Sequence, residues 1–150
     1  MPRNTKIQHV WTVLCRESII NAETNNISLL DTLESITVSF GEGTKVKKGN
    51  KISVPIMYEL VTLWELTGSI NGEVLVNMEY SLIDPVGNVL IFQPVNVKFP
   101  KNKNRIRYRQ KFSGFPFTEP GRYLLQIKSK MADSDEYKIT AEVPIEVKVK

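Results

Sequence analysis

Cysteine and histidine are almost absent from this 150-residue chain, which contains one of each, Cys15 and His9. A lone cysteine forms no internal disulfide, so the sequence favours a reducing compartment and a cytoplasmic location. One cysteine and one histidine also supply too few ligands for a tetrahedral zinc site. If they share one strand, their spacing separates them by about 20 Å. We therefore expect no Cys–His nucleophile pair.

Long apolar runs and phosphate-binding loops are also missing. The longest apolar run is far shorter than the roughly 18 residues of a membrane span, and the N-terminal run lacks the features of a secretory signal. Gly41-Glu42-Gly43 lacks the remaining spacing of a phosphate loop and carries an acid where phosphate would bind. Turn chemistry accounts for the clustered acids Glu23 and Asp31. The sequence therefore predicts no catalytic residue, no cofactor and no metal.

Apolar residues that alternate with polar ones dominate the rest of the chain. Residues 7–40 contain two extended segments joined by a polar turn at 21–26, and we expect every later strand to pack against this pair. Residues 31–35 could form either a bulge or a short helical turn. Trp11 and Val13 share one face of the first segment with His9, which is expected to line the core or a sheet end.

Further strands are expected between turn-forming tracts at 41–51, 69–72, 84–88, 115–121 and 132–136. Two rows are expected to face inward: Val74, Val76, Met78, Tyr80 and Leu82, and then Ile139, Ala141, Val143, Ile145, Val147 and Val149. About eight strands spaced by turns predict one domain over residues 1–150. Its expected fold is an all-β, antiparallel, immunoglobulin-like β-sandwich, with a small β-barrel as the second choice.

A proline–glycine tract followed by a tyrosine, Pro120-Gly121-Arg122-Tyr123, resembles the tyrosine corner of immunoglobulin-like sandwiches. The opening pattern, with its polar hairpin at 20–26 and the apolar residues that follow, is similar to that of a family of small uncharacterised microbial immunoglobulin-like proteins. The last strand, 143–149, extends this resemblance over nearly the whole chain. The resemblance implies a fold but no activity, and it brings no functional residues with it.

One charge asymmetry stands out. A basic segment between residues 98 and 111 contains seven cations and no acid: Lys98, Lys101, Lys103, Arg105, Arg107, Arg109 and Lys111. Residues 53–97 contain five acids and no lysine or arginine. Because side chains alternate along a strand, the last four cations would share one face over about 20 Å. Tyr108 would then face the opposite way, where it offers the cations no aromatic stacking platform.

Two interpretations of the basic segment stay open. As plain surface, its arginines would pair across strands with glutamates such as Glu59 or Glu79, or its lysines would protect a sheet edge. As a binding face, it would take an acidic protein, a nucleic acid or an acidic lipid surface. The leading hypothesis is a non-catalytic binding module that docks an acidic partner there. Nonspecific nucleic-acid binding through the same strand is the alternative, and an enzyme that uses carboxylates is the third.

Overall fold

The computed structural model describes residues 5–41, 50–68, 70, 72–134 and 136–150, which form nine β-strands. The strands are β1 (Lys6–Ile20), β2 (Ile27–Thr32), β3 (Ser35–Val38), β4 (Ile52–Thr67), β5 (Val74–Ile83), β6 (Val89–Phe99), β7 (Arg105–Phe117), β8 (Gly121–Met131) and β9 (Lys138–Val149). Most of the predicted turn at 41–51, and part of that at 69–72, lie outside the described residues. No helix in the described ranges is long and apolar enough to cross a membrane.

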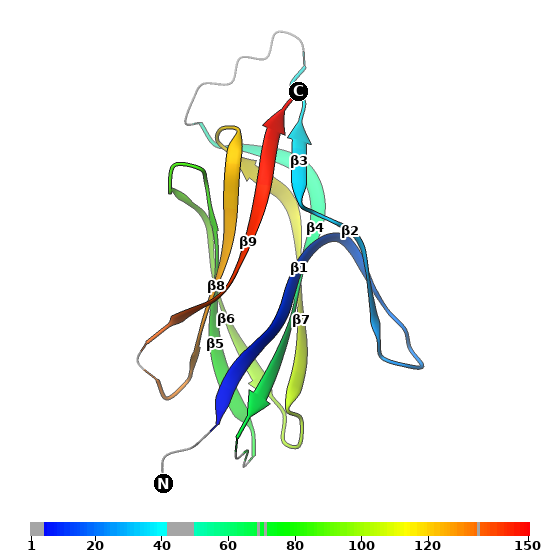
Figure 1. The fold of residues 1–150 in the computed structure, drawn as a ribbon, viewed down its shortest axis with the longest axis vertical. Helices are drawn as coiled ribbons and strands as arrows, with labels where there is room; N and C mark the ends of the chain where they lie inside the picture. Colours follow the sequence, from blue (N-terminus) through cyan, green and yellow to red (C-terminus); the bar gives the residue numbers. More distant parts are fainter. Residues whose placement is uncertain (1–4, 42–49, 69, 71, 135) are drawn as a thin grey trace.

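The strands form two curled sheets that face each other (Figure 1). One sheet has the order β2-β1-β4-β7, and the other has the order β3-β9-β8-β5-β6. The prediction of an all-β sandwich is therefore confirmed. Every pairing is antiparallel except that of β3 with β9, which is parallel. This parallel pair arises because the chain changes sheets between β2 and β3, and this crossing turns a predicted single strand into two.

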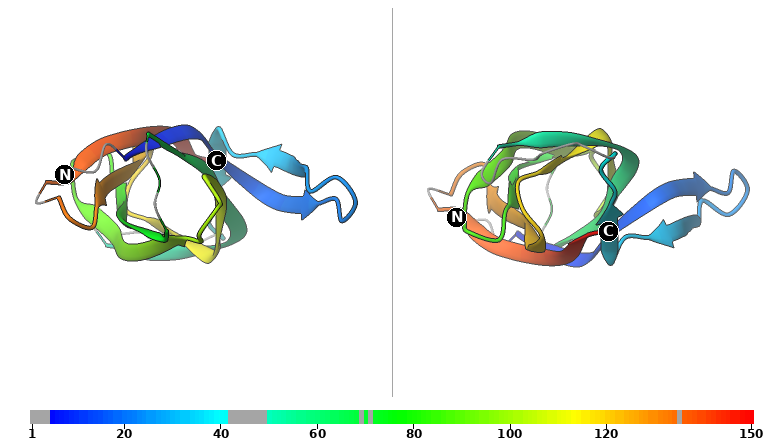
Figure 2. Two further views of the ribbon diagram at one scale, coloured as in Figure 1. Left: turned by 90° about the horizontal axis from the view of Figure 1, so that it is seen from below. Right: turned by 90° about the horizontal axis from the view of Figure 1, so that it is seen from above.

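The first hairpin lies at the edge of the sandwich, so the expectation that all later strands pack against it is wrong. Strand β2 pairs only with the Cys15–Ile20 end of β1, and Figure 2 shows this β1–β2 hairpin protruding from the ring of strands. Asp31 adopts a left-handed conformation with φ 56°, after which the chain passes into the other sheet. Strand β4, which pairs with both β1 and β7, lies at the centre instead.

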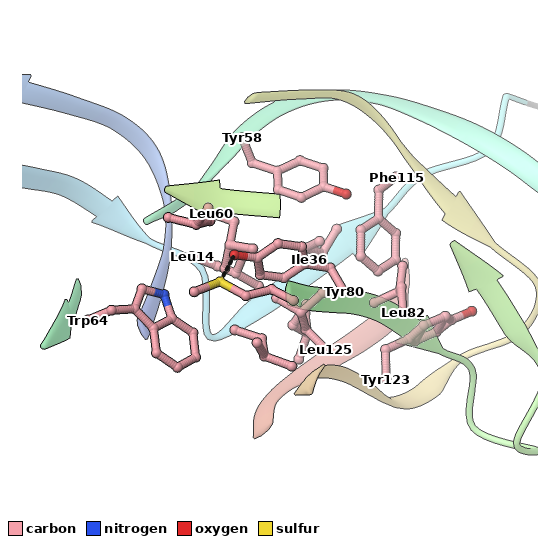
Figure 3. Close-up of a cluster of buried hydrophobic side chains, with 14 of the residues drawn as sticks. Leu14, Ile36, Tyr58, Leu60, Trp64, Tyr80, Leu82, Phe115, Tyr123 and Leu125 are labelled. Carbon is pink, nitrogen blue, oxygen red and sulfur yellow. Dashed lines mark hydrogen bonds between the residues drawn. The ribbon is translucent and has the colours of Figure 1, made fainter. Parts of the chain in front are cut away.

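The two sheets enclose one core (Figure 3). The predicted inward row of β5 is confirmed, because its five residues from Val74 to Leu82 are all buried. The predicted row of β9 is only partly correct. Ile145 and Val147 are buried, but Ile139 and Val149 are 56% and 42% exposed. These two residues lie near the ends of the strand, so the alternating pattern extends further than the burial does.

The tract expected to form a tyrosine corner makes the expected type of contact. The Tyr123 hydroxyl donates a hydrogen bond to the backbone oxygen of Glu119 at 2.7 Å and accepts one from the backbone N–H of Thr118 at 2.9 Å. The Thr118 hydroxyl donates to the Asp84 carboxylate at 3.0 Å. The turn after β7 is thereby fixed to the turn after β5, although the two lie far apart in sequence.

Candidate binding surface on the basic segment

The seven cations of the basic segment lie on two neighbouring edge strands and the turn between them. Lys98 is on β6, Lys101 and Lys103 are in the β6–β7 turn, and the remaining four, Arg105, Arg107, Arg109 and Lys111, are on β7. The β7 residues lie opposite Glu65, Leu63, Val61 and Glu59 of β4 respectively. This register places the four β7 cations on one face of the sheet, as the alternation predicted.

Three of the seven cations are paired with glutamates. Lys98 lies 3.0 Å from Glu73, Arg105 lies 2.8 Å from Glu65, and Lys111 lies 3.9 Å from Glu59. The expected partner Glu59 is therefore correct. The other, Glu79, is wrong, because it lies on β5 in the opposite sheet, where its neighbours are Pro94 and Lys128.

Two arginines contact the β1–β2 hairpin rather than solvent alone. Nη2 of Arg107 donates to the backbone oxygen of Asn25 at 3.0 Å, and Nη1 of Arg109 donates to the Ser18 hydroxyl at 3.1 Å. Nε of Arg107 is buried and has no hydrogen-bond partner among the described residues. The hairpin contacts were missed at the sequence level because neither Ser18 nor Asn25 is charged. These two arginines therefore have a structural role.

Glu59 links the two halves of this surface. Its side chain is 7% exposed, and it accepts a hydrogen bond from the Ser18 hydroxyl while it pairs with Lys111. Burial, together with the nearby charge of Glu59, raises the pKa of the Cys15 thiol, although a backbone hydrogen bond at Glu17 opposes this shift. A buried thiol with a raised pKa is a poor nucleophile, in agreement with the expectation that Cys15 acts as a small apolar residue.

The exposed cations of the basic segment include those of its turn as well as Arg109 and Lys111 on β7. Lys101 and Lys103 are both exposed, and neither forms an ion pair with any carboxylate in the part of the chain that the structure describes. Lys98 and Arg105 flank the turn; Lys98 pairs with the exposed Glu73, and Arg105 pairs with Glu65, whose side chain is 29% exposed. Exposed pairs such as that of Lys98 contribute little to stability, at most about 1 kcal/mol. These four side chains, Lys98, Lys101, Lys103 and Arg105, form what we call the basic turn.

Tyr108 is excluded from the basic face, as the alternation predicted. Its ring stacks on Tyr80 of the opposite sheet, with ring centroids 5.8 Å apart. Burial raises the pKa of both phenols, most strongly that of Tyr80. The aromatic side chain within the basic segment therefore contributes to the contact between the two sheets, where no incoming base could stack on it.

His9 occupies a separate position near the start of β1. Its Nε2 lies 2.6 Å from the Thr12 hydroxyl, and its ring packs edge-on against Trp64 at 5.2 Å. Burial lowers the pKa of the imidazole, although a backbone hydrogen bond at Trp11 opposes this shift. His9 is thus a half-buried residue near one end of the sheet. Within the described ranges, no group of three metal-ligating side chains is present.

Comparison with known proteins assigns no family. No family model matches the chain. No curated protein matches it either. Among solved structures, the chain is similar to the alkylpurine DNA glycosylase AlkC from Pseudomonas fluorescens bound to DNA containing an abasic site analog. In that alignment the identity is 10%, the TM-score is 0.42, and 97% of this chain and 31% of the glycosylase are covered.

The chain is also similar to two further solved structures, again at low sequence identity. For a family 123 glycoside hydrolase from Clostridium perfringens, the identity is 11% and the TM-score 0.39, with 76% of this chain and 22% of the hydrolase covered. For the N-terminal domain of PorA, the identity is 10% and the TM-score 0.27, with 93% of this chain and 98% of that domain covered. The chain thus spans less than a third of the first two proteins. TM-scores this low carry no argument about its function.

Proposed function

We propose that this protein is a non-catalytic binding module that docks an acidic partner on the basic turn. The observation that carries the proposal is the state of Lys101 and Lys103, which are exposed and without a carboxylate partner in the described ranges. The neighbouring Lys98 is held only by the exposed Glu73, which an acidic partner could replace at little cost, whereas Arg105 donates two hydrogen bonds to the half-buried Glu65. Turns on a rigid sandwich commonly carry binding residues.

The remaining cations of the basic segment are assigned a supporting role. Arg107 and Arg109 hold the β1–β2 hairpin, and Lys111 lies beside the buried Glu59. Substituting them would disturb the fold as well as the surface charge. The proposed docking surface is therefore narrower than the full basic segment.

We further propose that the sandwich is of the immunoglobulin-like type and that the protein is cytoplasmic. Strands β5, β8 and β9 lie in one sheet with β8 in the middle, as the strands C, F and G do in immunoglobulin domains. Tyr123 stands near the start of β8, where the tyrosine corner of strand F occurs. The cytoplasmic location is supported by the single cysteine, Cys15.

The proposal is tested by reversing the two unpaired charges of the basic turn. We expect the double variant Lys101→Glu/Lys103→Glu to bind labelled polyglutamate at least about tenfold more weakly than the wild type, because charge complementarity is lost. The measurement is fluorescence anisotropy at low and physiological salt, since screening should weaken any such binding. The control is Lys148→Glu/Lys150→Glu, which makes the same change in net charge at exposed positions beside β3.

Equal binding by the two double variants would overturn the assignment to the basic turn. The same titration against a single-stranded oligonucleotide tests the alternative partner. Tighter binding to the oligonucleotide than to polyglutamate, lost in the basic-turn variant, would identify a nucleic acid as the partner instead. Because Tyr108 stacks inside the sandwich, such binding would depend on phosphate contacts and decrease steeply with salt.

A further inference from the structure

In the part of the chain that the structure describes, two strand edges lack a full-length partner on the side of the molecule away from the basic segment. In the first sheet, β2 pairs with β1 only over Cys15–Ile20, so the Lys6–Val13 part of β1 has β4 as its only strand partner in the described residues. In the second sheet, β3 pairs with β9 only from Glu146 onward. Figure 2 shows β1 and β9 running side by side where the two sheets meet.

The link between β2 and β3 crosses one end of this seam, which we call the closed end although a hollow of about 610 Å³ also lies there. In the described residues no such link crosses the other end, which we call the open end. At the closed end, the N–H of Leu33 donates to the carbonyl of Leu14 at 2.8 Å. At the open end lies a groove of about 600 Å³ between the start of β1, the end of β8 and the start of β9. This volume is within the range of ligand-binding sites. The edge of β1 that it borders is four residues long, Lys6–His9, or about 13 Å of extended chain.

The backbone of β1 is oriented to pair within this groove. The backbone N–H of Leu66 on β4 donates a hydrogen bond to the backbone oxygen of Asn104, which directly precedes β7, at 2.7 Å. Successive residues of a strand direct their backbone N–H and carbonyl groups to opposite sides. Those of Glu65, the residue before Leu66, are therefore directed toward Gln8 of β1, its partner in the sheet. The N–H and carbonyl of Ile7, the next residue, are therefore directed away from β4 and toward the groove that Ile7 lines.

The side chains of the groove indicate what kind of strand would fit. Its charged residues are Lys6, Lys130, Lys138 and Glu136. None of the three lysines forms an ion pair with a carboxylate in the described ranges. Ile139, which also lines the groove, is 56% exposed. The walls thus combine an excess of positive charge with an exposed apolar side chain.

Three of the neutral polar side chains of the groove are already hydrogen-bonded within the protein. The hydroxyls of Ser129 and Thr140 lie 2.6 Å apart, and Nε2 of His9 is bound to Thr12. The ammonium group of Lys130 lies over the Tyr137 ring, 5.1 Å from its centroid. This leaves the ammonium groups of Lys6 and Lys138 and the backbone of Ile7 for a ligand. A peptide strand with alternating acidic and apolar side chains would satisfy both.

We propose that an extended peptide with acidic side chains adds as a further strand to the Lys6–His9 edge of β1, within this groove. The added strand would take, at the open end of the seam, the place that β2 takes beside β1 at the other end. Main-chain hydrogen bonds supply affinity in this mode of recognition, and the flanking side chains supply selectivity. The lysines select acidic strands and also oppose pairing of two copies of this edge.

The test uses a labelled peptide of alternating glutamate and valine, with a lysine–valine peptide as its charge-reversed match. We expect saturable binding of the acidic peptide only, accompanied by slower hydrogen exchange at the amide of Ile7, measured by NMR. N-methylation of every second peptide amide should abolish binding, because a strand needs those donors. The variant Lys6→Glu/Lys138→Glu should bind the acidic peptide about tenfold more weakly or worse, since like charges are then opposed.

The matched control is Lys148→Glu/Lys150→Glu, which changes the net charge equally at exposed positions at the other end of β9. It should retain both binding of the glutamate–valine peptide and the protection of Ile7. The proposal is overturned if the acidic peptide does not bind, if the N-methylated peptide binds equally well, or if Ile7 gains no protection. Equal binding by Lys6→Glu/Lys138→Glu and the wild type would also overturn it. In each of these cases the lysines act only to protect the edge.

Discussion

Asp84 shows how one buried charge joins two distant turns. Its carboxylate accepts hydrogen bonds from the backbone N–H groups of Val86 at 3.1 Å and Asn88 at 2.7 Å, and from the Thr118 hydroxyl at 3.0 Å. Burial alone would raise the pKa of Asp84, but these bonds and that from the Asn88 side chain outweigh it and lower the pKa. At Gly121 of the same corner, φ is 141° and an added Cβ would lie 2.9 Å from Pro85, so this position requires glycine.

The first residue-scale prediction concerns Asp84→Asn. We expect this substitution to cost about 1–3 kcal/mol of unfolding free energy at neutral pH, because an amide group replaces one of the accepting oxygens. The folded-state pKa of Asp84 is lower than that of unfolded aspartate, roughly 3.9. Its stabilisation is therefore complete above that value and is lost as the pH falls through the folded-state pKa. Urea denaturation across this pH range measures both effects.

The comparison variant for Asp84 is Glu23→Gln in the exposed turn of the first hairpin. It removes the same charge and should change stability by less than about 0.5 kcal/mol. The difference in unfolding free energy between the wild type and Asp84→Asn should become smaller as the pH falls. A difference that stays constant down to the acid unfolding transition would contradict the assigned role of the carboxylate.

At the scale of the element, the part of the β1–β2 hairpin beyond Cys15, where the β1–β4 pairing ends, is held against the sandwich by a few polar contacts. Its strand β2 pairs with β1 alone, and its side-chain contacts to the β4–β7 surface include Ser18 with Glu59 and with Arg109. Ile19, Ile20 and Leu30 are each more than a third exposed. The hairpin therefore depends for its position on hydrogen bonds rather than on a large apolar interface.

Ser18→Ala tests this attachment. The substitution removes the hydroxyl donor of the buried Glu59 and the acceptor of Arg109, so we expect a loss of about 1–3 kcal/mol. Amide hydrogen exchange over residues 19–26 should become faster, because the hairpin opens more readily. Ser28→Ala, at an exposed position on β2, is the control and should leave both quantities unchanged. If exchange in the hairpin responds equally to both substitutions, the Ser18 contacts do not hold it.

At the scale of the whole molecule, two sheets share a single core. Rows of buried residues from β4, β5, β8 and β9 meet between the sheets, with Trp64, Tyr80, Tyr123 and Phe115 among the largest fully buried side chains. Tyr58 is also buried there, which raises the pKa of its phenol to about 12. Because neither sheet has an apolar core of its own, we expect the described sandwich to unfold as one unit.

Ile127→Ala tests this cooperativity. Ile127 is fully buried on the central strand β8, so its truncation should cost about 2–5 kcal/mol. Fluorescence of the two tryptophans, which are both in the first sheet, and far-UV circular dichroism should report the same urea midpoint in the wild type and in the variant. Separate midpoints for the two probes would show that the sheets unfold independently.

The sequence by itself determined the strands and most of their inward faces. Period-two alternation is a local property of a strand, and it correctly predicted the buried row of β5 and the inward direction of Tyr108. The turn chemistry of Pro120-Gly121-Arg122-Tyr123 likewise predicted the hydroxyl-to-backbone contact of Tyr123. Each of these outcomes depends on neighbouring residues, which the sequence contains in full.

Only the tertiary structure decided which strands lie beside one another and which groups each charged side chain contacts. The crossing of the chain after Asp31 puts β2 and β3 in different sheets and leaves the edge of β1 open, which alternation alone cannot reveal. The same packing turns Arg107 and Arg109 toward the first hairpin, whereas Lys101 and Lys103 stay exposed. Strand pairing joins residues far apart in the chain, so the partners of a charge follow from topology rather than from sequence spacing.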